Sequence, residues 1–267
     1  MRRKIFIFIM VFYVLFFPVR LLMAQDIPWR NHRLEASYSY EYLDPRQAYG
    51  DWHTLNLALY TDISPTFTYL VEGTLFNRHG DNGIAGTVGA YKYWSSWLNT
   101  YSAISVGSNT EYLHRFRADH DFNLKVGKEN ICVLTAGATY INYSDNRYDF
   151  IVSGGPVLYL DKWILQYRLF RNESNPGSVE SFSHLISIGY GMEYWQWTYL
   201  NISFGNQAYM ATYLSTPEAV NNDSLEIALK HRHWLGKYYG IFGEVSYFKL
   251  EEGYEKYEIT CGVFYVF

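Results

Sequence analysis

Apolar and polar residues alternate with a period of two along most of the chain. In the final segment, residues 257, 259, 261, 263, 265 and 267 are Tyr, Ile, Cys, Val, Tyr and Phe, whereas 256, 258, 260 and 262 are Lys, Glu, Thr and Gly. Successive side chains of a β-strand point to opposite faces, so this pattern indicates a strand with one apolar face. "LEASYSYEY" (34–42), "ADHDFNLKV" (118–126) and "WILQYRLF" (163–170) alternate in the same way. The pattern predicts an all-β chain.

The alternating segments predict about fourteen strands, an even number as in single-chain bacterial membrane barrels. The segments are 33–43, 51–61, 66–77, 83–93, 97–106, 117–127, 130–143, 147–160, 162–172, 180–193, 196–205, 223–233, 238–249 and 255–267. Segments 83–93 and 97–106 alternate least regularly. Merging two weak segments would give twelve strands instead.

The connections between these segments fall into two alternating sets. Longer ones include "YLDPRQAYGD", "RHGDNG", "NESNPGSVES" and the stretch at 206–222, whereas "DISP", "WSSW", "LDK" and "WLGK" are shorter. Short turns at one rim and longer loops at the other are typical of outer-membrane barrels. We therefore expect an antiparallel transmembrane β-barrel of this class.

The positions of tryptophan, which do not enter the assignment of the strands, provide a check. Six of the eight Trp residues fall at the short turns, where an aromatic girdle at one membrane interface would collect them. They are Trp94, Trp97, Trp163, Trp195, Trp197 and Trp234.

The N-terminal 24 residues have the pattern of a secretory signal peptide, with basic residues, an apolar run and a small residue, Ala24. The alternative is a membrane anchor, but Pro18 and Arg20 interrupt the apolar run. We expect residues 1–24 to be removed, 25–32 to form a short periplasmic lead-in, and 33–267 to form the barrel in the outer membrane of a Gram-negative-type bacterium.

Composition excludes some classes of protein. Aromatic residues make up 19% of the chain and the formal net charge is −4, so nothing indicates nucleic-acid binding. The main rival fold is an exported soluble sandwich or lipocalin-like barrel. Its core faces would be rich in Leu, Val and Ile, whereas the apolar faces here mix Tyr, Gly, Ala and Leu.

If the apolar faces contact outer-membrane lipid, the opposite faces line the lumen with charges of both signs. The candidate lumen residues are Glu72, Asp121, Lys125, Arg168, Glu226, Lys230, Arg232, Glu244 and Glu258. They could brace a closed interior, or they could line a water-filled pore for a small polar or saccharide solute. The pattern does not choose between these.

Evidence for catalysis is weak. His231 and His233 share a strand face but have no third ligand at a recognisable spacing, and His120 and His184 are single candidates for a lipid-modifying site. Cys132 and Cys261 fall on apolar faces about half a barrel apart, too far for a disulfide. We expect no enzyme activity, metal or cofactor.

The last residue is expected to be structural, because the final strand must pair with the first to leave no open edge in lipid. Val263, Tyr265 and Phe267 share one face of this strand. They resemble the C-terminal signal that outer-membrane barrels present to their assembly machinery.

The order of segments resembles the YaiO-type outer-membrane proteins over about residues 33–267. The resemblance lies in "LEASYSYEYLD", "DWHTLNLALY", "TLFNRHGDNGIAGTVGAYKYW" and "YDFIVSGGPVLYLDKWILQYRLFRNE". His79, between Arg78 and Gly80, stands where such proteins usually have an aromatic residue. The resemblance implies a single outer-membrane barrel of unassigned activity.

We therefore favour a passive pore or export conduit for small polar or saccharide solutes. The alternatives are a closed barrel that acts through its outer loops, above all the long loop at 206–220, and a lipid-modifying enzyme.

Overall fold

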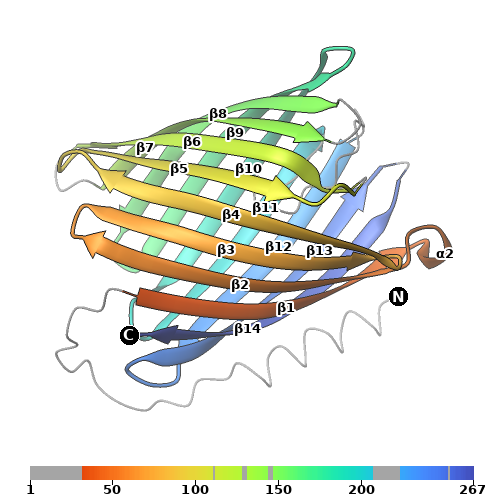
Figure 1. Cartoon of the computed structure of the whole chain (residues 1–267). Helices are drawn as coiled ribbons and strands as arrows, with labels where there is room; N and C mark the ends of the chain where they lie inside the picture. Colours follow the sequence, from red (N-terminus) through yellow and green to blue (C-terminus); the bar gives the residue numbers. More distant parts are fainter. Residues whose placement is uncertain (1–31, 111, 128–130, 144–146, 207–222, 252) are drawn as a thin grey trace.

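The computed structural model describes residues 32–110, 112–127, 131–143, 147–206, 223–251 and 253–267. Within these ranges fourteen strands form one closed antiparallel barrel, in which each strand pairs with its neighbours in sequence (Figure 1). The predicted signal peptide, almost all of the lead-in and residues 207–222 lie outside the described residues. The leader and the lead-in therefore stay predictions.

The fourteen predicted strands are confirmed, with bounds within three residues of those expected. The strands are β1 (His32–Asp44), β2 (Asp51–Ser64), β3 (Phe67–Arg78), β4 (Asp81–Tyr93), β5 (Leu98–Gly107), β6 (His114–Val126), β7 (Cys132–Tyr143), β8 (Tyr148–Leu160), β9 (Trp163–Asn175), β10 (Val179–Met192), β11 (Gln196–Asn206), β12 (Asp223–Trp234), β13 (Tyr239–Leu250) and β14 (Glu255–Val266). A short helix, α2 (Arg46–Tyr49), lies between β1 and β2. No helix in the described residues is long and apolar enough to cross a membrane.

The barrel closes between the first and the last strand. β1 and β14 pair from Arg33 opposite Val266 to Asp44 opposite Glu255. Beyond this ladder, the Phe267 amide donates to the His32 carbonyl at 2.9 Å and the His32 amide donates back at 3.1 Å. The terminal residue thus completes the ladder that closes the barrel.

β4 and β5 are regular strands although their sequences alternate poorly. Their inward positions carry small residues, such as Gly83, Ala85 and Ala103, where other strands carry charged ones. Period-two alternation weakens when the inner face is filled with small residues rather than polar ones. The strands form because both edges are paired, not because the alternation is strong.

One connection expected to be long is a tight turn. β3 and β4 remain paired as far as Arg78 opposite Asp81, which leaves only His79 and Gly80 between them. Both have positive φ, 51° and 84°, as a two-residue hairpin of the I′ type requires. Asn or Asp is more usual at the first position, so the His-Gly pair gives a weak turn signal in the sequence.

The two rims differ less than the sequence predicted, because the "NESNPGSVES" connection is also short, with only residues 176–178 between β9 and β10. Figure 1 shows α2 at one rim and the paired ends of β1 and β14 at the other. We call the rim with α2 the outer rim and the opposite rim the periplasmic rim. This assignment follows the outer-membrane convention that short turns face the periplasm.

Candidate functional site

All nine candidate lumen residues lie on the inward face of the barrel. Inward positions follow from the strand registers, since a residue and its two cross-strand partners point to the same side of the sheet. Lys230, for example, lies between Tyr199 of β11 and Glu244 of β13. The nine are Glu72 of β3, Asp121 and Lys125 of β6, Arg168 of β9, Glu226, Lys230 and Arg232 of β12, Glu244 of β13 and Glu258 of β14.

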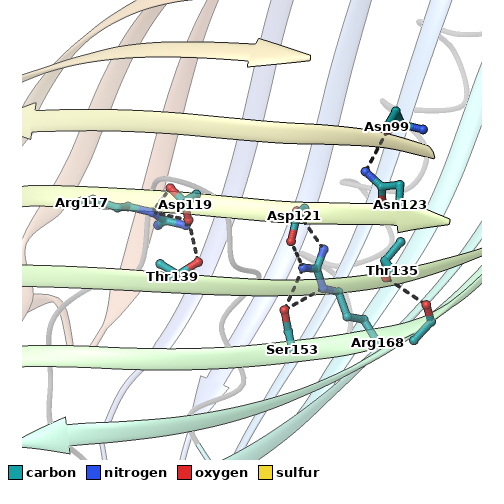
Figure 2. A network of polar contacts seen from close by, with 10 residues as sticks. Asn99, Arg117, Asp119, Asp121, Asn123, Thr135, Thr139, Ser153 and Arg168 are labelled. Atoms are coloured by element: carbon teal, nitrogen blue, oxygen red, sulfur yellow. Dashed lines mark hydrogen bonds and ion pairs between the residues drawn. The ribbon is translucent and has the colours of Figure 1, made fainter. Parts of the chain in front are cut away.

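One polar cluster joins three strands on the wall between β4 and β9. Figure 2 shows the guanidinium of Arg168 reaching across the wall to Asp121 and Ser153. It donates to the Ser153 hydroxyl from Nη2 at 2.8 Å and from Nε at 3.0 Å, and Nη2 also pairs with Asp121 Oδ1. A Cβ at the inward position Gly137 would collide with both Asp121 and Arg168. This glycine therefore gives the ion pair room to lie flat against the wall.

A second ion pair lies beside the first, toward the outer rim. Arg117 donates to Asp119 through Nε at 2.8 Å and through Nη2 at 2.9 Å, and the Thr139 hydroxyl donates to the same carboxylate at 2.6 Å. Such bidentate ion pairs fix the orientation of both side chains. Toward the periplasmic rim, Asn123 donates to Asn99 at 3.0 Å (Figure 2).

These groups surround a cavity of about 330 Å³, which we call the wall recess. Its lining includes Tyr91, Tyr101, Asp119, Asp121, Gln166 and Arg168. The rings of Tyr91 and Tyr101 lie 4.6 Å apart between centroids, and Tyr91 is 36% exposed. The recess therefore combines flat aromatic faces with ordered polar groups.

The opposite wall, where the barrel closes, is packed more tightly. The Lys256 ammonium lies 3.0 Å from Glu41 Oε2 and 3.4 Å from Glu258 Oε2. The Glu41 side chain is only 1% exposed, and Thr54 and Thr260 donate further hydrogen bonds to the two carboxylates. The buried Lys256 ammonium thus forms ion pairs with two buried carboxylates, one on β1 and one on β14.

Three candidate residues, Lys230, Arg232 and Glu244, lie on this side of the lumen, nearer the periplasmic rim. Lys230 is 3.9 Å from Glu244 and its side chain is 43% exposed, so it is largely hydrated. Arg232 pairs with Glu35 at 2.5 Å and its guanidinium lies 4.8 Å from the centre of the Phe264 ring. Reversing the charge of Arg232 would therefore disturb packing, whereas the side chain of Lys230 is more exposed, 43% against 16% for Arg232.

The other candidate lumen residues are Glu72, Lys125 and Glu226, on β3, β6 and β12 respectively. Glu72 accepts a hydrogen bond from Thr74 at 3.4 Å, and Thr74 in turn accepts one from Asn56 at 2.9 Å. Lys125 lies 5.7 Å from the centre of the Tyr93 ring. Glu226 lies opposite Ser203 and Phe248 in the ladder.

The predicted aromatic girdle is only partly formed by the residues expected. Trp94, Trp97, Trp163 and Trp195 are exposed at the periplasmic rim. Trp197 and Trp234 instead lie on the inward face, in a cluster with Phe242 and Phe264, and Trp234 is only 8% exposed. Placing these two in the girdle was wrong, because they lie on the strand face that carries Arg232 and pack against Phe242 and Phe264 on the inner wall.

The outer mouth of the lumen also contains aromatic side chains. The Arg78 guanidinium lies 4.3 Å from the centre of the Trp52 ring and 4.9 Å from that of Tyr112. Its Nε and Nη1 atoms are buried and have no hydrogen-bond partner among the described residues. Burial raises the pKa of Tyr112, whose hydroxyl donates to the Asp81 carbonyl at 3.1 Å. Trp52 also belongs to a buried group with Leu43, Leu250 and Tyr254, which narrows the mouth on the seam side.

The histidine candidates are not brought together. His120 and His184 lie on the outward faces of β6 and β10, with three strands between them, and bond to Ser102 and Tyr167 respectively. His231 and His233 are also outward, and His231 bonds to Thr198 at 2.8 Å. Among the described residues, no three His, Cys, Asp or Glu side chains gather as metal ligands.

Other outward positions agree with contact to lipid. Cys132 of β7 and Cys261 of β14 are free thiols on opposite sides of the barrel. Val263, Tyr265 and Phe267 are exposed at the end of the closing strand. Their role as an assembly signal stays a prediction.

Of the residues that line the wall recess, the predicted lumen set contains only Asp121 and Arg168, and Arg117, Tyr91 and Tyr101 are among those missed. Arg117 has the same parity as Asp119 and Asp121 but stands at the first predicted residue of its strand, and Tyr91 and Tyr101 were treated only as part of the aromatic content. Parity alone would have placed Arg117 inside, since it lies four positions from Asp121. The segments of Tyr91 and Tyr101 alternate weakly and contain no predicted lumen residue, so parity gave no reference there.

Solved structures of similar shape are outer-membrane barrels. A bacterial polysaccharide outer membrane secretin aligns with 89% of this chain and 99% of its own, at 7% identity and a TM-score of 0.57. A mutant of the TodX monoaromatic hydrocarbon channel aligns with 89% of this chain and 90% of its own, at 8% identity and a TM-score of 0.55. For Omp33 from Acinetobacter baumannii the coverages are 89% and 99%, the identity 10% and the TM-score 0.52. At these identities the similarity shows a shared fold alone.

Comparison of sequences identifies the family. No curated protein matches the chain significantly. Residues 31–210 match the YaiO membrane beta barrel domain. This match covers more than half of the chain and includes β1 to β11, with the wall recess. The chain is therefore an outer-membrane β-barrel that belongs to the YaiO family.

Proposed function

We propose that the barrel is a passive pore or export conduit for small polar or saccharide solutes. The observation that carries this proposal is the hydrated charge inside the barrel. The Lys230 side chain is 43% exposed although it points inward, and the wall recess provides further polar surface. A barrel filled by its own side chains would bury these groups, whereas a water-filled passage leaves them accessible.

Charge at Lys230 is expected to influence which ions pass. Replacing Lys230 by Glu reverses a lumen charge whose side chain is 43% exposed, so the preference for K⁺ over Cl⁻ should rise by at least about twofold. The measurement is the reversal potential of the refolded protein in a planar bilayer with a salt gradient. Unchanged selectivity would contradict the placement of Lys230 along the ion path.

A matched control is Lys249→Glu, which makes the same charge change on the outward face of β13 near the outer rim. It should leave the selectivity as in the unmodified protein. Heat-dependent gel mobility shows that both variants fold.

A closed barrel that acts through its outer loops is the second candidate. The buried seam around Lys256 and the aromatic side chains at the outer mouth favour it, because they fill part of the lumen. A lipid-modifying reaction at His120 or at His184 is the third candidate. Three strands separate the two residues on the outward surface, so they could not act together. A folded protein that conducts no ions would favour the closed barrel.

A further inference from the structure

Two tyrosine rings face the lumen at the wall recess. Outward aromatic residues contact lipid, but Tyr91 and Tyr101 lie opposite each other on the inward faces of β4 and β5. Tyr91 remains 36% exposed, and its ring is tilted by 35° to that of Tyr101. Tyr91 therefore presents part of a flat apolar ring to the lumen, and such surface gains free energy when a ligand covers it.

The polar side of the wall recess is ordered before any ligand arrives. Arg117 holds Asp119, and Arg168 holds Asp121 against Ser153. Each pair leaves oxygen or nitrogen atoms at the recess, and Gln166 lines the same space. Held in this way, the groups lose little conformational freedom when they bind a ligand.

The charges of the recess compensate each other. Two guanidinium groups face two carboxylates, so the recess has many hydrogen-bonding atoms but little net charge. An anion would have to displace a carboxylate from an arginine, and a cation would have to displace an arginine from a carboxylate. A neutral ligand with several hydroxyl groups needs neither exchange.

We propose that the wall recess binds one ring of a neutral saccharide, whose C–H face stacks on Tyr91 while its hydroxyl groups bond to the ion pairs. A pyranose has an apolar face and a rim of hydroxyl groups, which matches the two sides of the recess. The volume of about 330 Å³ is within the range of small-ligand sites. This inference rests on the proposed function, because a solute must enter the lumen to reach the recess.

The test is equilibrium binding of maltotriose to the refolded protein in dimethylamine-oxide micelles, which carry no sugar headgroup to compete. Titration calorimetry should give a dissociation constant on the order of 1 mM. Tyr91→Ala should weaken binding about tenfold because the stacking surface is lost, whereas Tyr91→Phe, which keeps the ring, should bind as before. Tyr199→Ala is the matched control, since it removes another inward ring that does not line the recess.

Loss of binding in Tyr91→Ala alone supports the proposal. No binding by the unmodified protein, or equal binding by all variants, overturns it. Binding of lysine in place of maltotriose also overturns it, because a charged ligand would then be preferred. Micellar binding does not require passage, so the two proposals fail separately. Conductance without maltotriose binding removes only the saccharide site, and binding without conductance removes only the pore.

Discussion

Replacing Lys256 by methionine is expected to lower the free energy of unfolding by about 3–5 kcal/mol. The change leaves Glu41 and Glu258 buried at the β1–β14 seam without the cation that lies 3.0 Å and 3.4 Å from them. Removing one partner of a buried ionic network costs far more than the network contributes, because the remaining charges stay out of water. The measurement is guanidinium-induced unfolding in phospholipid vesicles, followed by tryptophan fluorescence.

Two variants control this prediction. Lys230→Met removes an ammonium that is 43% exposed and 3.9 Å from its acid, so it should change stability by less than about 1 kcal/mol. Glu41→Gln combined with Lys256→Met removes one of the stranded charges and should recover part of the loss. If Lys256→Met alone cost no more than Lys230→Met, the seam would be hydrated and the description of a tightly packed wall would be wrong.

Deleting residues 261–267 is expected to prevent folding altogether. These residues pair with Arg33–Tyr38 of β1 on one side and with Tyr239–Gly243 of β13 on the other. Their loss opens the barrel and leaves backbone groups of both neighbours unpaired in lipid, where each costs several kcal/mol. Gel mobility should then be the same in heated and unheated samples.

The matched control is Val263→Ala with Tyr265→Ala, which removes outward side chains and keeps every backbone hydrogen bond of β14. This variant should fold, with a stability loss set by the lost apolar contacts alone. A truncated protein that still showed a heat-dependent shift would contradict closure of the barrel by β14.

Much of the fold could be predicted because side chains along a strand alternate between its two faces with a period of two. Once Asp121 is assigned to the lumen, Lys125 four residues later must also face inward, and the register carries the assignment to every neighbouring strand. The same rule would have placed Trp197 inside, since it shares a face with Asn201 and Ser203. The prediction failed there because rim position was considered and parity was not.

The contacts across the lumen wall could not be predicted in this way. Asp121 and Arg168 are 47 residues apart and meet only because strand stagger and the inward Gly137 bring them together. The Lys256 network likewise depends on how β1 and β14 align at closure. Periodicity gives the face of each side chain, whereas barrel tilt and stagger decide which inward side chains meet.

The most direct test of an open passage is the single-channel conductance of the folded protein in a planar bilayer. The proposed pore predicts stable current steps for the unmodified protein, whose ion preference then shifts toward cations in Lys230→Glu. A protein that shows the heat-dependent gel shift and inserts into the bilayer, yet gives no current steps, would contradict the pore and indicate a barrel closed by its own side chains.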